Sequence, residues 1–336
     1  MKIIVTGGAG FIGSHTVVDL LENGYEPIVI DDFRNSKPFI IERIKKITNK
    51  DFVSYNFDCG DIKKLSSVFL KEKPDAIIHF AADKAVNESV SNPLKYYHNN
   101  ISTLVNVLSV VNKSKVKSFV FSSSCTVYGV PKKVPVSEFS PIQQAFSPYG
   151  FTKQIGEQIL SDFAKSNPGV SISLLRYFNP IGAHPSGLIG ELPLGVPSNL
   201  VPFITQTAIG IRESLIVHGN DYDTTDGTCI RDYIHVLDLA RAHVLAFSNY
   251  LKKNNKPLIL NIGTGKGSSV LEVIESFKKV NKTNLNYTFG PRRDGDAPCV
   301  YANSSLAKKV LGWEHKFSLE DALSHAWEWE KQLSIL

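Results

Sequence analysis

The sequence KIIVTGGAGFIG, which spans residues 2–13, decides the fold. Its opening run is apolar and β-branched, which predicts a buried strand over residues 2–6. Gly7, Gly10 and Gly13 follow at intervals of three, and a helical pattern begins among them. In such a loop the first glycine permits a tight turn, the second lets a diphosphate approach the backbone, and the third lets helix pack on strand. The free N–H groups of the helix start attract anions. We therefore predict a dinucleotide site.

The next strand indicates which dinucleotide is bound. Residues 27–31 read as a strand that ends in Asp31-Asp32, and Asp31 lies 18 residues after Gly13. An acid about 20 residues beyond the last glycine receives the ribose hydroxyls of NAD. Two adjacent carboxylates would also repel the additional phosphate of NADP. We predict NAD as the cofactor.

Short apolar runs alternate with amphipathic helical stretches through the first half of the chain. The further predicted strands are residues 52–56, 76–80, 119–122 and 171–177, and the predicted helices are residues 11–23, 38–48, 62–71, 93–112 and 149–165. Strands with so little polar alternation are typical of a parallel sheet covered on both faces. The alternation predicts an α/β fold, a Rossmann-type doubly wound parallel sheet.

The rhythm changes after residue 178. Residues 179–200 are rich in glycine and proline, which predicts a long binding loop. Beyond it we expect helices near residues 199–211, 235–251, 268–280 and 319–331, with short strands at 215–218 and 258–262. The predicted organisation is an NAD-binding domain over residues 1–178 and a smaller mixed C-terminal substrate lobe over residues 179–336.

Composition excludes several classes of protein. The chain of 336 residues is 43% hydrophobic and 21% charged, values typical of a globular protein. No apolar run approaches the roughly 18 residues of a membrane helix. The net charge of +5 is small and scattered, so we predict no nucleic-acid partner. The four cysteines form no CxxC pair and the N-terminus lacks a secretory pattern, so we predict a cytoplasmic protein without a metal site.

Three polar groups have a spacing suited to proton transfer. The serine run 122–124 closes a predicted strand, at the sheet edge where parallel sheets bind ligands. Tyr149 and Lys153 are four residues apart and would share one helix face. A phenol is a poor base near neutral pH, but a lysine ammonium and a nicotinamide cation would both favour the phenolate. We predict Tyr149 as the acid–base group, with Lys153 and Ser124 assisting it.

Ordered motifs along nearly the whole chain carry a family resemblance. They are VTGGAGFIGSH (5–15), IHFA (78–81), KAV (84–86), FSSSCTVYG (121–129), SPYG (147–150), LRYFNPIGAHPSG (175–187), RDYIH (231–235) and RRDGD (292–296). In these the sequence resembles the extended short-chain dehydrogenase/reductases, and among them the UDP-glucose 4-epimerases. The resemblance implies reversible epimerisation of UDP-glucose and UDP-galactose through a 4-keto sugar, with a resident NAD and a homodimer formed through helices 93–112 and 149–165.

The resemblance also implies site residues, position by position. The cofactor side comprises Gly7, Gly10, Phe11, Ile12, Gly13, Asp31, Asp32, Phe33, Asn35, Ser36, Asp58, Cys59, Phe80, Ala81, Ala82, Lys84, Asn99, Ser122, Tyr149, Lys153 and Phe178. The UDP-hexose side comprises Lys84, Ser124, Tyr149, Asn179, Asn199, Leu200, Ile216, Val217, His218, Arg231, Tyr233, Arg293, Asp296 and Val300. The guanidinium groups of Arg231 and Arg293 suit phosphate oxygens.

Three positions depart from the family pattern. Asp32 stands where asparagine is usual, and Ala82 stands where glycine is common. Val300 falls where the family sets access for the sugar's 2-substituent: tyrosine excludes N-acetyl sugars and a small residue admits them. The resemblance therefore implies activity on UDP-N-acetylglucosamine and UDP-N-acetylgalactosamine as well, unless Val300 merely packs in the core.

Two other functions remain open from the sequence. A nucleotide-sugar 4,6-dehydratase, or another NAD-dependent UDP-sugar-modifying enzyme, would use the same scaffold. The dehydratase needs an acidic pair just after the serine run, where this chain has Ser124-Cys125-Thr126. A non-catalytic NAD-sensing regulator could dispense with Tyr149 and Lys153, and both are present.

Overall fold

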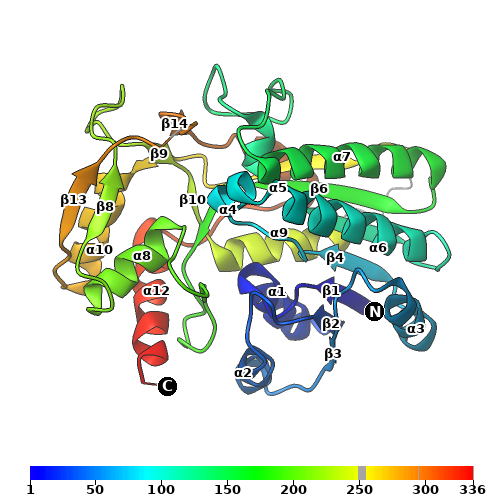
Figure 1. The fold of residues 1–336 in the computed structure, drawn as a ribbon. Coiled ribbons are helices and arrows are strands. Elements are labelled where there is room, and N and C mark those ends of the chain that lie inside the picture. Colours follow the sequence, from blue (N-terminus) through cyan, green and yellow to red (C-terminus); the bar gives the residue numbers. More distant parts are fainter. Residues whose placement is uncertain (249–254, 294, 336) are drawn as a thin grey trace.

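The computed structural model describes residues 1–248, 255–293 and 295–335. A central sheet of seven parallel strands organises the chain (Figure 1). Its spatial order is β11-β6-β5-β4-β1-β2-β3. The strands are β1 (Lys2–Thr6), β2 (Glu26–Asp31), β3 (Val53–Asn56), β4 (Ala76–His79), β5 (Ser118–Ser122), β6 (Ser171–Tyr177) and β11 (Leu258–Ile262). The predicted doubly wound sheet is confirmed.

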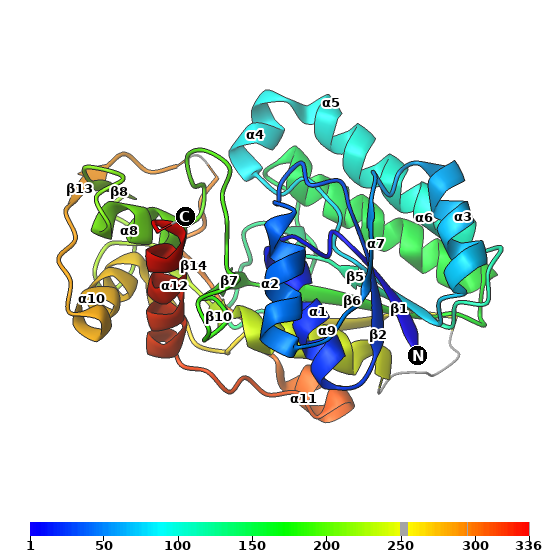
Figure 2. The same ribbon diagram turned by 90° about the horizontal axis from the view of Figure 1, so that it is seen from below.

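Helices cover both faces of this sheet (Figure 2). One face carries α1 (Phe11–Glu22), α2 (Phe39–Thr48), α9 (Val236–Ser248) and α11 (Ser305–Leu311). The other carries α3 (Ile62–Glu72), α6 (Thr103–Val111) and α7 (Pro148–Ser166). Successive strand residues alternate between the two cores: Ile3 and Val5 pack on the first face, and Ile4 packs on the second. This double burial explains the apolar strands of the sequence.

The order of the strands places the functional edge. The strands that follow β1 in the chain are added on one side of it, whereas β4 and the strands after it are added on its other side, so β1 and β4 are hydrogen-bonded neighbours. At such a switch point the loops after the two strands diverge and leave a crevice beyond their carboxyl ends. The glycine loop follows β1, and Phe80 to Lys84 follow β4.

The predicted helix over residues 93–112 is wrong as a single element. The chain instead forms α4 (Val86–Ser91), α5 (Pro93–Tyr96), the wider π-helix η1 (Tyr97–Ser102) and then α6. Asn100 of η1 is buried and bonds the backbone N–H and C=O of Asp83 as well as the Thr152 hydroxyl. These tertiary bonds hold the π-helical turn against the loop after β4. Single π-helical turns are often found at functional sites.

The remaining chain forms a smaller lobe beside the sheet (Figures 1 and 2). Its helices are α8 (Leu200–Ala208), α10 (Val270–Asn281) and α12 (Leu319–Leu333). Its strands pair in three small sheets: β7 (Asn179–Ile181) with β10 (Tyr233–His235), β8 (Leu215–His218) with β13 (Tyr287–Gly290), and β9 (Ile230–Arg231) between β12 (Ser268–Ser269) and β14 (Cys299–Val300). A third apolar core lies among α8, α10 and α12.

The chain crosses between the two parts more than once. β11 supplies the seventh strand of the central sheet, and α9 packs on α1, although both lie beyond residue 178. A single cut between residues 178 and 179 therefore does not separate the sheet from the lobe. The predicted helix over residues 235–251 corresponds to α9, and its last three residues lie outside the described part of the chain.

Candidate active site

The glycine loop leaves room for a diphosphate at the start of α1. Gly7 has φ +70°, a left-handed conformation that glycine adopts without strain. A Cβ on Gly13 would lie 2.1 Å from the Gly7 carbonyl oxygen, so only glycine lets helix and strand approach this closely. No side chain caps α1, and its first turn holds no acid. Its free N–H groups therefore fit the diphosphate of a dinucleotide.

Asp31, at the end of β2, holds the adjacent loop in place. Its Oδ2 accepts a hydrogen bond from Ala9 N, and its Oδ1 accepts bonds from Phe33 N and Ser36 Oγ, all at 2.9 Å. Burial raises the pKa of Asp31, and these bonds oppose that shift. A carboxylate offers about four lone-pair directions. Three are used within the chain, which leaves one for a ribose hydroxyl.

Further residues predicted on the cofactor side gather at the neighbouring strand ends. Asp58 follows β3, Lys84 follows β4, and Asn99 lies in η1. The structure adds Arg34, which sequence reasoning missed: its guanidinium bonds Asp32, Asp58 and Asn99 together. Arg34 lies in a loop without periodicity, so no sequence pattern indicated its partners.

Tyr149, Lys153 and Ser124 come together at the carboxyl edge of the sheet. Both helix residues are on the buried face of α7, and Ser124 follows β5. The Lys153 ammonium donates to the Ser122 carbonyl oxygen at 2.8 Å and lies 5.7 Å from the centroid of the Tyr149 ring. Ser124 lies close enough to the Tyr149 phenol for its hydroxyl to lower the pKa of that phenol. The hydroxyl groups and the ammonium thus share one desolvated space.

The electrostatics of this space do not favour a phenolate on their own. Burial raises the pKa of the Tyr149 phenol well above its usual value of 10, Tyr177 raises it further, and the nearby Ser124 hydroxyl lowers it. Burial also lowers the pKa of Lys153 to about 8, against the opposing carboxylate of Glu157. Lys153 alone therefore does not make the phenol acidic. A nicotinamide cation beside the ring would supply the missing positive charge.

A buried charge network that the sequence analysis missed supports these groups. Glu157, one turn after Lys153, accepts two bonds from the Arg176 guanidinium at 2.9 and 2.6 Å and a third from the Ser123 hydroxyl at 2.5 Å. Arg176 also donates to the Tyr128 hydroxyl at 3.0 Å. The one arginine in strand 171–177 was the available signal, because a buried cation requires an acidic partner.

The predicted substrate residues come from several elements of the lobe. Arg231 of β9 pairs with Asp296 at 3.1 Å, and Val300 of β14 lies beside Arg231 in register. Asn199 precedes α8, and its amide donates to Glu191 at 2.7 Å. The remaining predicted residues are Asn179 on β7, Leu200 on α8, Tyr233 on β10, Arg293 after β13, and Ile216, Val217 and His218 on β8. Figure 1 shows β8 on the side of the lobe away from α7, so the predicted substrate residues span much of the lobe.

One carboxylate links the two sides of the site. Glu191, in the loop after β7, is buried, and its Oε1 accepts bonds from both Lys84 Nζ at 2.8 Å and Asn199 Nδ2 at 2.7 Å. Trp329 of α12 donates to the Glu191 carbonyl oxygen at 2.8 Å. Sequence reasoning had no signal for this acid, because Lys84 lies 107 residues before it in the chain.

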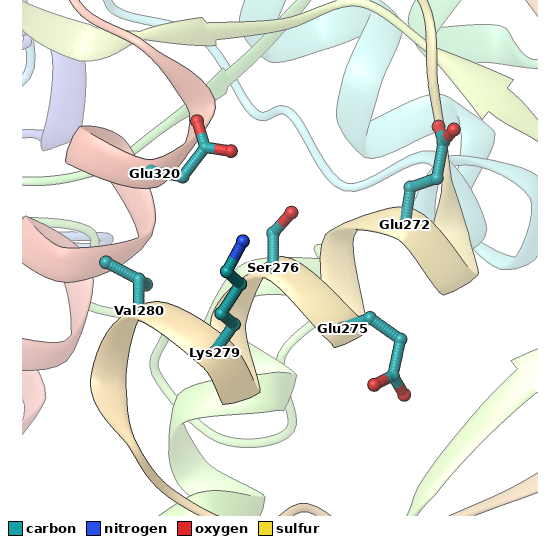
Figure 3. A pocket seen from close by; sticks show the side chains of 6 residues that line it. All are labelled: Glu272, Glu275, Ser276, Lys279, Val280 and Glu320. Carbon is teal, nitrogen blue, oxygen red and sulfur yellow. The ribbon is translucent and has the colours of Figure 1, made fainter.

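A surface groove of about 580 Å³ lies apart from these residues, between α10 and α12 (Figure 3). Ser276 and Lys279 point from α10 toward α12, which carries Glu320. The other acids of the groove make local contacts, since Glu272 caps α10 and Glu275 pairs with Lys278.

Within the described residues no three potential ligand side chains are grouped to hold a metal ion. Nor does that part of the chain contain a helix long and apolar enough to cross a membrane.

The fold and this site define a class of protein. A doubly wound sheet, a glycine loop at its switch point and a buried Ser–Tyr–Lys set characterise the extended short-chain dehydrogenase/reductases. Residues 4–326 match the family described as GDP-mannose 4,6 dehydratase. The chain is 49% identical over 330 residues to the UDP-glucose 4-epimerase of Bacillus subtilis (strain 168), covering 98% of this chain and 97% of the relative.

Solved structures agree with this relationship. The UDP-glucose 4-epimerase of Stenotrophomonas maltophila, with bound NAD and formylated UDP-arabinopyranose, superposes with a TM-score of 0.96 at 43% identity, covering 100% of this chain and 99% of the other. The enzyme from Bifidobacterium longum, in complex with NAD⁺ and UDP, gives 0.95 at 44% identity, covering 99% and 98%. The chain belongs to the matched dehydratase-type family and, within it, to the UDP-glucose 4-epimerases.

Proposed function

We propose that this chain is an NAD-dependent isomerase that interconverts UDP-glucose and UDP-galactose. The observation that carries the proposal is the buried set of Ser124, Tyr149 and Lys153 at the switch edge of the sheet, in a chain that matches UDP-glucose 4-epimerases along 98% of its length. When bound, NAD supplies the hydride acceptor and donor for carbon 4 of the sugar. The net reaction is redox-neutral.

The chain's own residues handle the proton. The Tyr149 phenolate accepts the proton of the 4-hydroxyl, and the neighbouring Ser124 hydroxyl orients that group. Lys153 places its ammonium 5.7 Å from the centroid of the Tyr149 ring, where its charge, together with that of a bound nicotinamide cation, would favour the phenolate. Because all three side chains are buried, water is kept from the 4-keto sugar. The 4-keto sugar then turns so that its other face meets the cofactor, and Tyr149 returns the proton to the oxygen on carbon 4, which completes the inversion at that carbon.

The two dinucleotide-like anions require two binding regions. We assign NAD to the glycine loop, Asp31 and the strand-end residues named above, because the cradle at Gly7 and Gly13 excludes any side chain. We assign the UDP diphosphate to Arg231 and Arg293 on the lobe. Asn179, at the start of β7, and Asn199, just before α8, would assist them. Arginine forks are suited to phosphate oxygens.

The decisive experiment is the absorbance of the purified protein before and after UDP-galactose is added, together with chromatography of the sugar products. We expect the NADH band to rise on mixing and UDP-glucose to form. Sugar conversion without any change at the cofactor, or reduced NAD without conversion, would contradict the proposal. A dehydratase would instead yield a 4-keto-6-deoxy product. The structure does not favour that reaction, because Glu138, the first acid after the serine run, is bound to the backbone N–H of Asn261 at 2.7 Å.

We propose further that UDP-N-acetylglucosamine and UDP-N-acetylgalactosamine are substrates. Val300 is buried with Phe178 and Ala302 in a small apolar cluster near Arg231. Its short side chain leaves more space than a tyrosine would at the same position. Incubation of the purified protein with either N-acetyl sugar tests this. Good conversion of UDP-glucose with none of the N-acetyl pair would contradict it.

We also propose a homodimer formed through the α4–α7 face. Val90, Leu94, Val105 and Phe151 expose apolar side chains there, and Leu94 is 77% exposed. Figure 1 shows α5, α6 and α7 side by side, and the proposed interface includes the surface that these helices form. Light scattering coupled to gel filtration should give twice the chain mass, and a monomer at micromolar concentration would contradict the proposal.

A cytoplasmic location is the last part of the proposal. All four cysteines are unpaired. Free thiols are typical of a reducing compartment. Fractionation of cells that produce the protein should place it with cytoplasmic markers.

A further inference from the structure

The loop that follows β2 has an unusual backbone. Phe33 has φ +59°, in the left-handed region that non-glycine residues adopt only when their surroundings hold them there. Here the surroundings are identifiable: Asp31 Oδ1 accepts from both Phe33 N and Ser36 Oγ. We call residues 32–36 the adenosine strap, because they connect the acid expected at the ribose to the loops on either side.

Arg34 fastens the strap to its neighbours. Its Nε donates to Asp32, its Nη2 donates to Asp58, and its Nη1 donates to Asn99 Oδ1 at 3.0 Å. These acceptors belong to three separate segments: the strap itself, the loop after β3, and the π-helix η1. Every nitrogen of the guanidinium therefore has its own partner, which fits the fixed fork of arginine better than a lysine.

Asn35 adds a second fastening on the other side. Its Nδ2 donates to Asp83 Oδ1 at 3.3 Å, in the loop after β4. Asp83 is itself fixed, because Asn100 bonds its backbone N–H and C=O. The strap is thus tied to the loops after β3 and β4, across the edge at which the cofactor binds.

Exposure gives the order of these groups from inside to outside. The Asp31 and Asp83 side chains are 8% and 2% exposed, whereas the Arg34 side chain is 42% exposed. Arg34 therefore lies on the solvent side of the acid expected to bind the ribose. We propose that Arg34 closes the adenosine end of the cofactor cleft and so retains NAD between catalytic cycles.

Retention has a physical purpose, which rests on the proposed epimerase function. The hydride leaves the sugar and must return to the same carbon, so a cofactor lost in mid-cycle would strand a 4-keto sugar. Arg34 could instead have served the additional phosphate of NADP. Its charge is already balanced by two carboxylates, Asp32 and Asp58, so the strap closes over the cofactor without offering a free cation.

The test measures release of NAD from the holoenzyme. Protein carrying NAD is diluted into ethanol with excess alcohol dehydrogenase, which reduces only NAD that has been released. We expect Arg34→Ala to release NAD at least 10-fold faster than the parent, with Arg34→Lys between them because one donor group replaces three. Lys37→Ala, which removes a nearby exposed cation for which the described residues offer no ion pair, should match the parent.

Salt provides a second readout. Because the strap is fastened by exposed charges, higher ionic strength should accelerate release from the parent and leave Arg34→Ala little changed. Release at the parent rate from both Arg34 variants would overturn the proposal. Failure of the proposed function would look different, since the parent would then hold NAD without interconverting UDP-glucose and UDP-galactose.

Discussion

The proton affinity of Tyr149 depends on groups that the chain only partly supplies. Burial opposes the phenolate, and Lys153, with a pKa lowered to about 8, does not offset burial alone. In the proposed mechanism a cationic nicotinamide would complete the acid–base group. Proton transfer would then depend on the oxidised cofactor, so the phenol would be activated only when hydride can also move.

Tyr149→Phe tests that assignment at the residue scale. Removal of the phenol should lower the epimerisation rate by about 10²–10⁴-fold, the usual contribution of a positioned acid–base group. Bound NAD should remain, because the glycine loop is untouched, and absorbance of the purified variant checks this. A variant that works near the parent rate would show that another group carries the proton.

Val300→Tyr should change substrate choice more than overall activity. A tyrosine at this buried position beside Arg231 would be larger than the valine, so turnover of the N-acetyl sugars should fall at least 10-fold relative to UDP-glucose. The ratio of kcat/KM for the two substrates measures it. Val300→Ala serves as the matched control and should preserve the ratio. Equal losses on both substrates would mean that Val300 only packs.

His79 gives a pH dependence with a definite sign. It is buried at the end of β4, bonded to Thr6 at 2.8 Å, and burial, with a contribution from Lys153, lowers its pKa to about 3. Between pH 6.5 and about 3, His79 is protonated in the unfolded chain but neutral in the native state. This histidine therefore costs stability as the pH falls, by roughly 1.4 kcal/mol per pH unit.

The comparison of parent and His79→Asn isolates that effect from other titrating groups. Asparagine can keep the bond to Thr6 but does not titrate. We expect the variant to have a lower free energy of unfolding than the parent at pH 7, measured with urea, and this difference should shrink as the pH is lowered to 5. A constant difference across this range would contradict the assigned pKa.

At the scale of the element, close packing of β1 against α1 sets the geometry of the glycine loop. Gly13→Ala would place a methyl 2.1 Å from the Gly7 carbonyl oxygen, which must displace the loop. Overpacking of this kind costs about 1–3 kcal/mol, so NAD content of the purified variant should fall sharply. Gly169→Ala is the control, because a Cβ there meets nothing within 4 Å. Full NAD content in Gly13→Ala would show that the loop can shift to accommodate the methyl group and still bind NAD.

At the scale of the whole molecule, Glu191 joins the central sheet to the lobe. Lys84 belongs to the loop after β4, whereas Asn199 starts α8, and both bond the same oxygen. The substrate loop is held a second time where Arg43 of α2 donates to the Leu188 carbonyl oxygen at 2.9 Å. Cofactor and substrate residues are therefore held in one geometry by the loop between them.

Glu191→Leu removes the shared acceptor. We expect the KM for UDP-glucose to rise about 10-fold with a smaller change in kcat, and stability to fall by about 1–3 kcal/mol. Calorimetric titration with UDP should show the same weakening. Glu275→Gln, which alters an exposed pair on α10, should change neither. Unaltered affinity for UDP in Glu191→Leu would show that the two sides do not depend on this link.

Much of the fold could be predicted because it depends on local patterns. The apolar strands of the sheet were located to within a residue, since burial on both faces leaves an uninterrupted apolar run. The helix over residues 93–112 failed because Asn100 bonds the loop after β4, a contact that no helical periodicity reveals. β11 was located but not assigned to the sheet, because the sequence of neither strand shows which distant strand it pairs with.

The sequence alone determined the sheet, the glycine loop, NAD and the class of reaction, and these are confirmed. The individual site residues stay predictions, although Ser124, Tyr149 and Lys153 do meet. Only the tertiary structure decided how charges are paired: Arg34 across three loops, Glu157 with Arg176, and Glu191 between Lys84 and Asn199. The physical reason is range. Periodicity and turn chemistry act between near neighbours, whereas a buried or bridging charge is satisfied by whichever partner the fold brings beside it.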